Sequence, residues 1–378
     1  MPLANAASYP IWANVLIFVV AAGVIWIAGG RLTRALDAIA ARTRLGHVFV
    51  GMLLLGGITS LPELANVATA SATGSPSLAA NNLLGSAAIN ILLLAVADAL
   101  IGRKAVTSIV AQPSTMMMAV LCMVVLMLIA GLVVLGDVSM GPPGFGSLIV
   151  GLLCIAFLWL AAGHDERAGW TLKDCEARQE QRDETVSKAP MRALWSRVAL
   201  QGACLFAAGY ALSQTGDAIA EQAGLTSAIV GFTLIGTATS LPELVTVITA
   251  LKLNRPEMAF GQVLGANFIN LSLLPIGDWI FDGEPVVNTL STFETISALL
   301  GAVMIGLFII GLLEHRNRTI FRMGVDSAAV MASFAVGLVP SQRSCCVDKR
   351  IAPKTGLERF PARRRQRCGA TESRVAHR

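Results

Sequence analysis

Long apolar stretches alternate along the chain with short polar connections. Apolar runs of about 18 or more residues predict helices that cross a membrane. Several of the runs contain Gly or Pro, which membrane helices tolerate. The ten runs are Ile11–Gly30, His47–Thr73, Ser77–Leu100, Ser114–Leu135, Phe145–Ala162, Leu194–Ser213, Ser227–Leu251, Met258–Phe281, Phe293–Leu313 and Met323–Val339. We therefore expect an all-α polytopic membrane protein with about ten transmembrane helices.

The pattern of residues inside these runs repeats after 180 positions. Without a gap, Gly46–Asp98 aligned on Thr226–Asp278 gives 22 identities in 53 positions. A composition this biased gives roughly a tenth by chance. The shift carries the second and third spans onto the seventh and eighth. Because the copies are an odd number of spans apart, they cross the membrane in opposite directions. Such inverted repeats occur in secondary transporters, with the substrate site where the repeats meet near the midplane.

The hexapeptide TSLPEL stands at the centre of each copy, at Thr59–Leu64 and at Thr239–Leu244. Pro62 and Pro242 have no N–H to donate to the carbonyl four residues earlier, so each is expected to free a backbone oxygen. In lipid an unsatisfied carbonyl costs several kcal/mol and needs a partner. A cation is one such partner.

Glu63 and Glu243 follow these prolines inside apolar surroundings. A charged side chain at a helix centre costs roughly 2.5–3.5 kcal/mol on insertion scales. No Lys or Arg occurs from Leu45 to Gly102 or from Val198 to Leu251. The compensating charge must therefore be a proton or a soluble cation, and two carboxylates match one divalent ion.

Hydroxyl and amide oxygens surround both glutamates in the sequence. Thr59 and Glu63, like Ser86 and Asn90, are four residues apart and share a helix face. The candidate ligands are Thr59, Ser60, Glu63, Ser86, Asn90, Thr239, Ser240, Glu243 and Asn270. Six to eight oxygen ligands suit Ca²⁺, whereas zinc and copper favour His and Cys clusters. The alternative for each single Ser or Thr is a hydrogen bond to its own helix backbone.

Other polar or small residues in the repeats receive structural interpretations. Four glycines are expected to permit close helix packing rather than bind an ion. They are Gly51, Gly85, Gly231 and Gly265. Asp98 and Asp278 lie near span ends and are interpreted as caps. Asp37 and Asp217, which the same shift relates, are expected in loops.

Composition and charge set the organisation of the chain. It is 54% hydrophobic and 14% charged. We expect a first repeat half at 1–163, a charged cytoplasmic loop at 164–193, a second half at 194–340 and a basic, disordered tail at 341–378. Among the loops between the runs, Lys and Arg occur only in the odd-numbered ones, so the positive-inside rule places the N-terminus outside a plasma (inner) membrane. The tail does not follow the positive-inside rule, since ten spans would put its eleven Lys and Arg residues outside. Either the tenth segment does not cross or the tail does not govern topology, and we favour the second.

These motifs resemble those of the sodium/calcium exchanger superfamily, the calcium/cation antiporters. Members carry two inverted α-repeats, each with GTSLPEL followed by a GSNIxN-type motif. Here the first repeat reads GGITSLPEL and NNLLGSAAIN, and the second reads GTATSLPEL and GQVLGANFIN. The resemblance extends from about Val15 to Leu313.

The resemblance implies a ten-helix fold in two inverted five-helix repeats. Spans two, three, seven and eight would form the core, and spans one and six a sliding gate. Glu63 and Glu243 would be the central ligands shared by Ca²⁺ and Na⁺, with the backbone oxygens of Thr59 and Thr239 joining Ca²⁺. The residues implied for Na⁺ or for lining the site are Ser60, Ser240, Ser86, Asn90 and Asn270. We expect no enzyme activity, no cofactor beyond the transported ions and no nucleic-acid partner. The sequence does not indicate an oligomeric state.

The companion motifs depart from the family pattern. Ile58 and Ala238 replace the glycine before the threonine, and Ala87 replaces the Asn of GSN. Ala266 and Gln262 replace a Ser and an Asn in the second repeat. The lost hydroxyl would weaken a Na⁺ position, so the counter-ion stays open between Na⁺ and H⁺. K⁺ dependence is not expected, since Asn270 stands where K⁺-carrying members tend to have Asp. A cation channel, and a membrane enzyme built on His164–Asp165–Glu166, are the alternatives of other classes.

Overall fold

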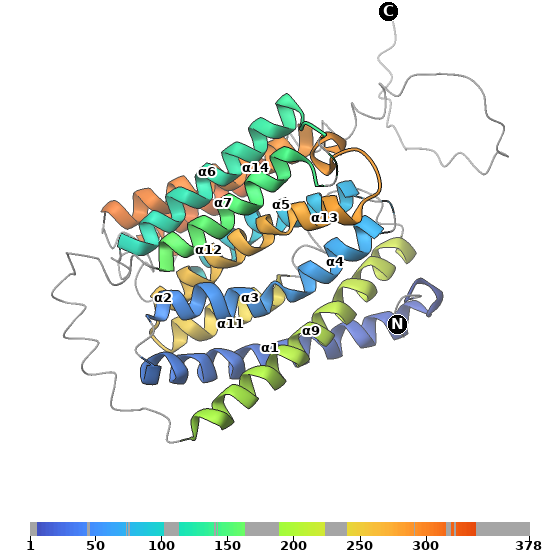
Figure 1. Ribbon diagram of the computed structural model, residues 1–378. Helices are drawn as coiled ribbons and strands as arrows, with labels where there is room; N and C mark the ends of the chain where they lie inside the picture. The colour runs from blue at the N-terminus through green and yellow to red at the C-terminus, as the bar shows by residue number, and fades with distance from the viewer. Residues whose placement is uncertain are drawn as a thin grey trace, which may run out of the picture.

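The computed structural model describes residues 6–43, 46–72, 76–101, 113–162, 189–223, 240–314 and 319–337, apart from isolated positions within these ranges. This part of the chain is almost entirely helical (Figure 1). The main helices are α1 (Ile11–Thr43), α4 (Leu61–Ala72), α5 (Pro76–Ile101), α6 (Pro113–Leu135), α7 (Phe145–Ala162), α9 (Met191–Gln222), α11 (Leu241–Lys252), α12 (Pro256–Ser272), α13 (Leu274–Ile280) and α14 (Thr292–Glu314). Short segments are η1 (Ala6–Ser8), α2 (His47–Phe49), the π-helical η2 (Val50–Leu55), α3 (Gly56–Thr59), the 3₁₀ turn η5 (Val286–Thr289), β1 (Thr319–Ile320) and β2 (Met323–Gly324).

Six of the described helices are each long and apolar enough to cross a membrane. The segments α2 to α4 meet the same criterion of length and composition when taken together, with a bend of 42° between their two parts. The predicted tenth span contains a shorter apolar helix, Val325–Gly337. Only the α11 part of the predicted seventh span is described. The long loop and the basic tail lie outside the described residues.

Polar and apolar side chains are distributed as a membrane requires. Most residues of α5 and α12, including Asn90 and Asn270, are buried at the centre of the bundle. Large apolar side chains face outward instead, such as Trp12 on α1, Leu135 on α6 and Trp159 on α7. An outer surface of large apolar side chains is suited to contact with lipid hydrocarbon and not with water. The chain is therefore a polytopic all-α membrane protein.

The two longest helices, α1 and α9, lie side by side along one side of the bundle (Figure 1). The 33 residues of α1, which is apolar enough to cross a membrane, exceed the roughly 20 that span a bilayer, so α1 must tilt or project beyond it. With 32 residues α9 is almost as long, but it is not among the six apolar helices, so the predicted sixth span stays a prediction. Two sequence predictions are wrong here. The first helix does not end near Gly30, and Asp37 and Asp217 are helical rather than in loops. Buried Leu36 and Ile39 continue the helical apolar spacing past the membrane-length run.

Glycines mark where these two helices cross the hexapeptide helices. A Cβ added at Gly29 of α1 would lie 3.1 Å from Val245 of α11. A Cβ at Gly209 of α9 would lie 2.7 Å from Pro62 of α4. Gly29 and Gly209 are related by the 180-residue shift. Each half of the chain therefore lays its long helix against the hexapeptide helix of the other half.

Asp98 and Asp278 tie the halves together in the same reciprocal way. Asp98, near the end of α5, accepts hydrogen bonds from Gly324 N at 2.8 Å and Ser327 Oγ at 2.7 Å. Asp278 on α13 accepts them from Gly144 N at 2.6 Å and Ser147 Oγ at 2.5 Å. The shift relates Gly144 to Gly324 and Ser147 to Ser327. The interpretation as caps is confirmed: each carboxylate caps the start of the last helix of the opposite half.

Removing either cap should weaken the assembly of the two halves. Asp98→Ala and Asp278→Ala each leave buried donors without an acceptor, and hydrogen bonds to a charged group contribute about 1.5–3 kcal/mol each. We expect a lower unfolding temperature for both single variants in detergent, measured by intrinsic fluorescence. Asp282→Ala, in the turn after α13, is the control that should leave the temperature unchanged. Equal temperatures for all variants and the parent would contradict the capping role.

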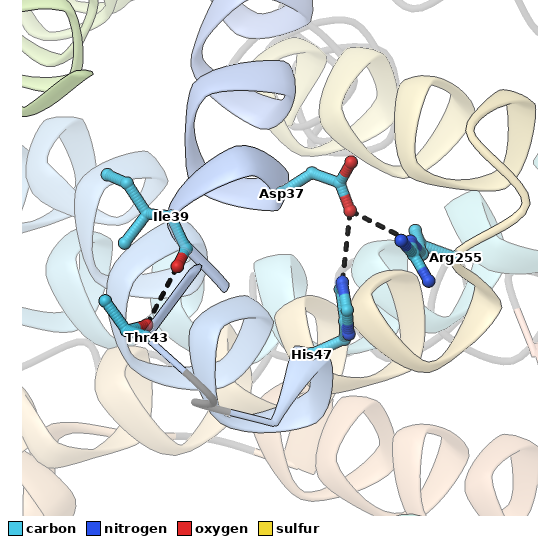
Figure 2. A network of polar contacts seen from close by, with 5 residues as sticks. All are labelled: Asp37, Ile39, Thr43, His47 and Arg255. Atoms are coloured by element: carbon cyan, nitrogen blue, oxygen red, sulfur yellow. Dashed lines mark hydrogen bonds and ion pairs between the residues drawn. The ribbon is translucent and has the colours of Figure 1, made fainter. Parts of the chain in front are cut away.

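A polar cluster attaches α1 to the rest of the bundle at one end (Figure 2). Asp37 Oδ1 accepts a hydrogen bond from Arg255 Nε at 2.9 Å and lies 3.1 Å from His47 Nε2. Asp37 belongs to α1, His47 begins α2, and Arg255 precedes α12. Figure 2 shows the two basic side chains converging on the same carboxylate oxygen. The cluster thus joins three elements at one face of the protein.

Candidate functional site

The first hexapeptide breaks its helix at the serine. In the second, a helix begins directly after the serine, and the residues before Ser240 lie outside the described part of the chain. In the first copy α3 ends at Thr59, Ser60 adopts ψ near 0°, and α4 begins at Leu61. In the second, Ser240 precedes α11 with φ −87° and ψ 8°. A proline within the first turn suits a helix start, because its missing N–H is not needed there. The π-helical η2 precedes the first break, and such distortions often occur at functional sites.

The breaks place both glutamates in the first turn of a new helix. Glu63 begins α4 and Glu243 begins α11. A helix N-terminus carries about half a positive charge and favours a carboxylate. This stabilisation was not anticipated from the sequence, where each hexapeptide lies inside one continuous apolar run. The helix starts at Leu61 and Leu241 therefore place each carboxylate where the helix dipole favours it. The release of backbone oxygens by the two prolines stays a prediction.

Close backbone packing brings the two halves together at these breaks. A Cβ at Gly51 of η2 would overlap the carbonyl oxygen of Met258 on α12. A Cβ at Gly265 would lie 2.5 Å from Met52 O, and one at Gly261 equally close to Val48 O. The packing role predicted for Gly51 and Gly265 is confirmed. Gly231 lies outside the described residues, and the role of Gly85 stays a prediction.

The predicted site residues that the structure describes are all buried. Each is 2% exposed or less: Thr59, Ser60, Glu63, Ser86, Asn90, Ser240, Glu243 and Asn270. Thr239 lies outside the described residues. Most of these side chains carry buried oxygen or nitrogen atoms with no hydrogen-bond partner among the residues that the structure describes, namely Ser60 Oγ, Glu63 Oε2, Ser86 Oγ, Asn90 Oδ1, Ser240 Oγ, both carboxylate oxygens of Glu243, and both amide atoms of Asn270. Buried polar atoms are nearly always paired, so these atoms form a candidate ligand site.

The two glutamates and Thr59 meet across the repeat interface. Glu63 and Glu243 are near enough for their charges to repel each other, and Thr59 lies against the Glu243 carboxylate. The Thr59 hydroxyl donates to Leu55 O at 3.1 Å, so its hydrogen is committed to its own helix. The Thr59 hydroxyl therefore follows the alternative given for a single Ser or Thr, a hydrogen bond to its own helix backbone. The hydroxyls of Ser60, Ser86 and Ser240 have no partner in the described ranges, so this alternative does not apply to them there.

Asn267 orients one of these oxygens and was missed in the sequence. Its Nδ2 donates to Ala87 O at 3.3 Å, and its Oδ1 accepts from Asn90 Nδ2 at 3.0 Å. Because a backbone carbonyl can only accept, these two successive hydrogen bonds fix the orientation of both side-chain amides. They leave Asn90 Oδ1 as a free acceptor among the described residues. The signal was present, since Asn267 is the Asn of the second GSN-type motif. The GSN-type motif has an Asn in each half of the family pattern, whereas this protein has Ala87 in the first half and Asn267 in the second.

Replacing Asn267 should impair the site without removing a ligand. In Asn267→Leu the Asn90 amide loses its orienting acceptor and can rotate. We expect the apparent affinity for the transported cation to fall about ten-fold, the effect of one hydrogen bond of about 1.4 kcal/mol. Cation binding to purified protein measures this, with Asn288→Leu in the distant η5 turn as control. An affinity within two-fold of the parent would contradict the orienting role.

The family comparison can be set against this geometry. The sequence pattern of the family described as "Sodium/calcium exchanger protein" matches residues 13–163 and 194–339, most of the chain. The chain belongs to the sodium/calcium exchanger family. This membership agrees with the resemblance carried by the two hexapeptides, and it makes the protein a cation antiporter by class.

Individual relatives of this exchanger family are distant. "Putative antiporter CaxA" of Alkalimonas amylolytica is 26% identical over 261 residues, covering 69% of this chain and 78% of that protein. "Sodium/calcium exchanger MaX1" of Methanosarcina acetivorans is 38% identical over 55 residues, 15% of this chain. A solved structure of the sodium-calcium exchanger NCX_Mj covers 87% of this chain and 99% of its own, with a TM-score of 0.66 and 16% identity. That structural likeness shows a shared fold.

Proposed function

We propose that the protein exchanges Ca²⁺ for Na⁺ or H⁺ across the membrane by alternating access. Glu63 and Glu243 are the central ligands of the transported ions. The observation that carries the proposal is the pair of buried carboxylates with unpartnered oxygens at the start of two inverted helices. No basic side chain from the surrounding spans is available in the sequence to neutralise them, so a cation must do so.

Hard oxygen donors define the ion class. Besides the two carboxylates, the site offers the hydroxyls of Ser60, Ser86 and Ser240 and the amide oxygen of Asn90. Such donors suit Ca²⁺, which accepts six to eight oxygens in flexible geometry. Release of Ca²⁺ from the site requires a competing cation to take its place, and both Na⁺ and H⁺ bind carboxylates. The name of the relative MaX1 includes sodium and calcium, which supports the Na⁺ form of the proposal.

Membrane orientation follows from the loop charges. We propose a plasma (inner) membrane location with the N-terminus outside, so that the Asp37 end of α1 faces the cytoplasm. Two inverted halves related by the 180-residue shift can then expose one shared site to each side in turn. No covalent step is required of any residue in this scheme.

Ion gradients imposed separately test the proposal and identify the counter-ion. Purified protein is reconstituted into liposomes, and ⁴⁵Ca²⁺ uptake is followed under a Na⁺ gradient, a pH gradient or neither. Uptake driven by the Na⁺ gradient alone assigns sodium exchange, and uptake driven by the pH gradient alone assigns proton exchange. Uptake that ignores both gradients would refute the proposed function.

A further inference from the structure

A buried side-chain amide on α12 lies next to the site but is not among its candidate ion ligands. Gln262 is fully buried, and its Oε1 has no hydrogen-bond partner within the described part of the chain. The 180-residue shift places it opposite Asn82 of the first half, where the family pattern also has Asn. A carbonyl oxygen that is buried and unpaired is rare, so Gln262 requires an explanation.

Thr246 fixes the direction of this amide. The Thr246 hydroxyl lies 2.8 Å from Pro242 O and 2.9 Å from Glu243 O, and both are backbone carbonyls that can only accept. Its hydrogen is therefore directed to the backbone, and its oxygen accepts from Gln262 Nε2. The amide cannot turn over without losing this bond. Gln262 Oε1 is consequently held as an acceptor, as Asn90 Oδ1 is held by Asn267.

The position of Gln262 is that of a site residue. On α12, Gln262, Ala266 and Asn270 follow at intervals of four and share one helix face. Thr246, which holds the amide, is one turn beyond Glu243 on α11 and contacts the Glu243 carbonyl. The amide thus lies between the helix that carries Asn270 and the first turn that carries Glu243.

We propose that Gln262 supplies an oxygen ligand to the transported cation, in place of the hydroxyl that Ala266 lacks. The first half provides the hydroxyl of Ser86, while the corresponding residue of the second half is Ala266. Glutamine is one methylene longer than the asparagine at the equivalent position, and this length extends its oxygen by part of a helical turn. The inference rests on the proposed exchange of hard cations at the Glu63–Glu243 site.

Equilibrium ⁴⁵Ca²⁺ binding to the purified full chain, together with liposome flux, tests this assignment. Gln262→Met preserves length and removes the oxygen, and Thr246→Val removes the group that orients it. We expect each to weaken Ca²⁺ binding about ten-fold and to raise the KM of flux, while Thr246→Ser restores both. Thr249→Val is the matched control, since Thr249 donates to Val245 O on the same helix at 2.7 Å.

The outcomes separate the ligand assignment from the proposed function. Binding within two-fold of the parent in Gln262→Met, with the parent binding Ca²⁺, overturns the ligand assignment alone. A parent that binds Ca²⁺ but shows no gradient-driven flux overturns the exchange function, and the binding series still decides the role of Gln262. A parent that binds no Ca²⁺ overturns both.

The Asp37 cluster carries a second, independent inference. The 180-residue shift takes Asp37, His47 and Arg255 to Asp217, Ser227 and Ser75. The second half therefore keeps the carboxylate and lacks both basic residues. The two halves therefore differ in charge at the positions of His47 and Arg255.

The Asp37 cluster is also placed where it can influence the access of cations to the Glu63–Glu243 site. The helices α1 and α9 are linked to each other at their other end, where Asn14 and Gln222 share hydrogen bonds with each other and with Tyr9 O. At the crossing points small glycines face the hexapeptide helices. Asp37, His47 and Arg255 provide a charged attachment between this helix pair and the core (Figure 2).

We infer that this cluster is a one-sided latch that closes the site at the face of the basic loops. It stabilises one of two access states that the repeat symmetry would otherwise make nearly equal. A site that is accessible from a face only part of the time has its apparent affinity from that face reduced by the same fraction. This inference also rests on the exchange function.

Sided flux measurements in vesicles of known orientation test the latch. Asp37→Asn and Arg255→Gln should improve the apparent Ca²⁺ affinity at the basic-loop face about five-fold and weaken it at the opposite face similarly. Arg34→Gln, which removes an exposed charge from the same helix, should change neither. Affinities that fall together at both faces, or stay unchanged at both, overturn the latch. Exchange by the parent is measured in the same vesicles, so failure of the exchange function is seen separately.

Discussion

Glu243→Gln should abolish cation exchange while the protein still folds and inserts. Glutamine keeps the size and the hydrogen-bonding carbonyl of glutamate, and it removes the charge that draws the cation into a site with no competing basic group. Two unit charges 4 Å apart attract each other by about 4 kcal/mol at an effective dielectric constant of 20. That loss corresponds to about a thousand-fold in binding. Glu63→Gln should behave in the same way.

The measurement is Ca²⁺ flux per molecule of folded protein, with folding judged by size-exclusion chromatography. The chain offers a matched control in Glu294, a buried glutamate in the first turn of α14. Glu294→Gln should retain exchange, which shows that the effect belongs to the hexapeptides and not to buried glutamates in general. Glu63→Gln or Glu243→Gln flux above about a tenth of the parent would contradict the central role of the pair.

Gly265→Val should prevent the two halves from assembling. The added Cβ would lie 2.5 Å from Met52 O and 2.6 Å from Met52 Cα. These are backbone atoms, so no side-chain rotation can relieve the overlap. Overpacking by a methylene group costs about 1–3 kcal/mol where side chains can adjust, and a backbone clash costs more. We expect little monodisperse protein after membrane extraction.

The control for this prediction is Gly131→Val. An added Cβ at Gly131 of α6 meets nothing within 4 Å, so the helix should accept valine. Both variants add the same apolar surface to a membrane helix. Equal yields of monodisperse protein from Gly265→Val and the parent would show that η2 and α12 are not packed backbone to backbone.

Much of the fold was predictable from the sequence because membrane helices need long apolar runs. The positions of α5, α6, α7 and α14 agree with the predicted spans within a residue or two. Helix ends beyond the membrane were not predictable from hydrophobicity, since Leu36 and Ile39 are buried against protein outside the apolar run. The α12–α13 break before Pro275 was also missed, because both parts lie in one apolar segment.

The site was predictable to the extent that the repeat made it visible. Glu63 and Glu243 recur in both copies with most of their companion oxygens, and the structure buries all of those it describes. Asn267 and Gln262 were passed over because each differs from its counterpart in the other half. The orientation of their amides depends on Ala87 O and Thr246, contacts that span the tertiary structure and leave no local pattern.

Calcium efflux from loaded proteoliposomes tests the central claim, that one shared site obliges exchange. Vesicles containing ⁴⁵Ca²⁺ are diluted into buffer that either lacks Ca²⁺, Na⁺ and a pH gradient or contains the counter-ion identified by the gradient experiments. The account predicts almost no efflux without the counter-ion and saturable efflux with it, because the site cannot switch its access from one side to the other while the glutamate pair is unneutralised. Efflux at the same rate in both buffers, without saturation, would indicate a channel and contradict it.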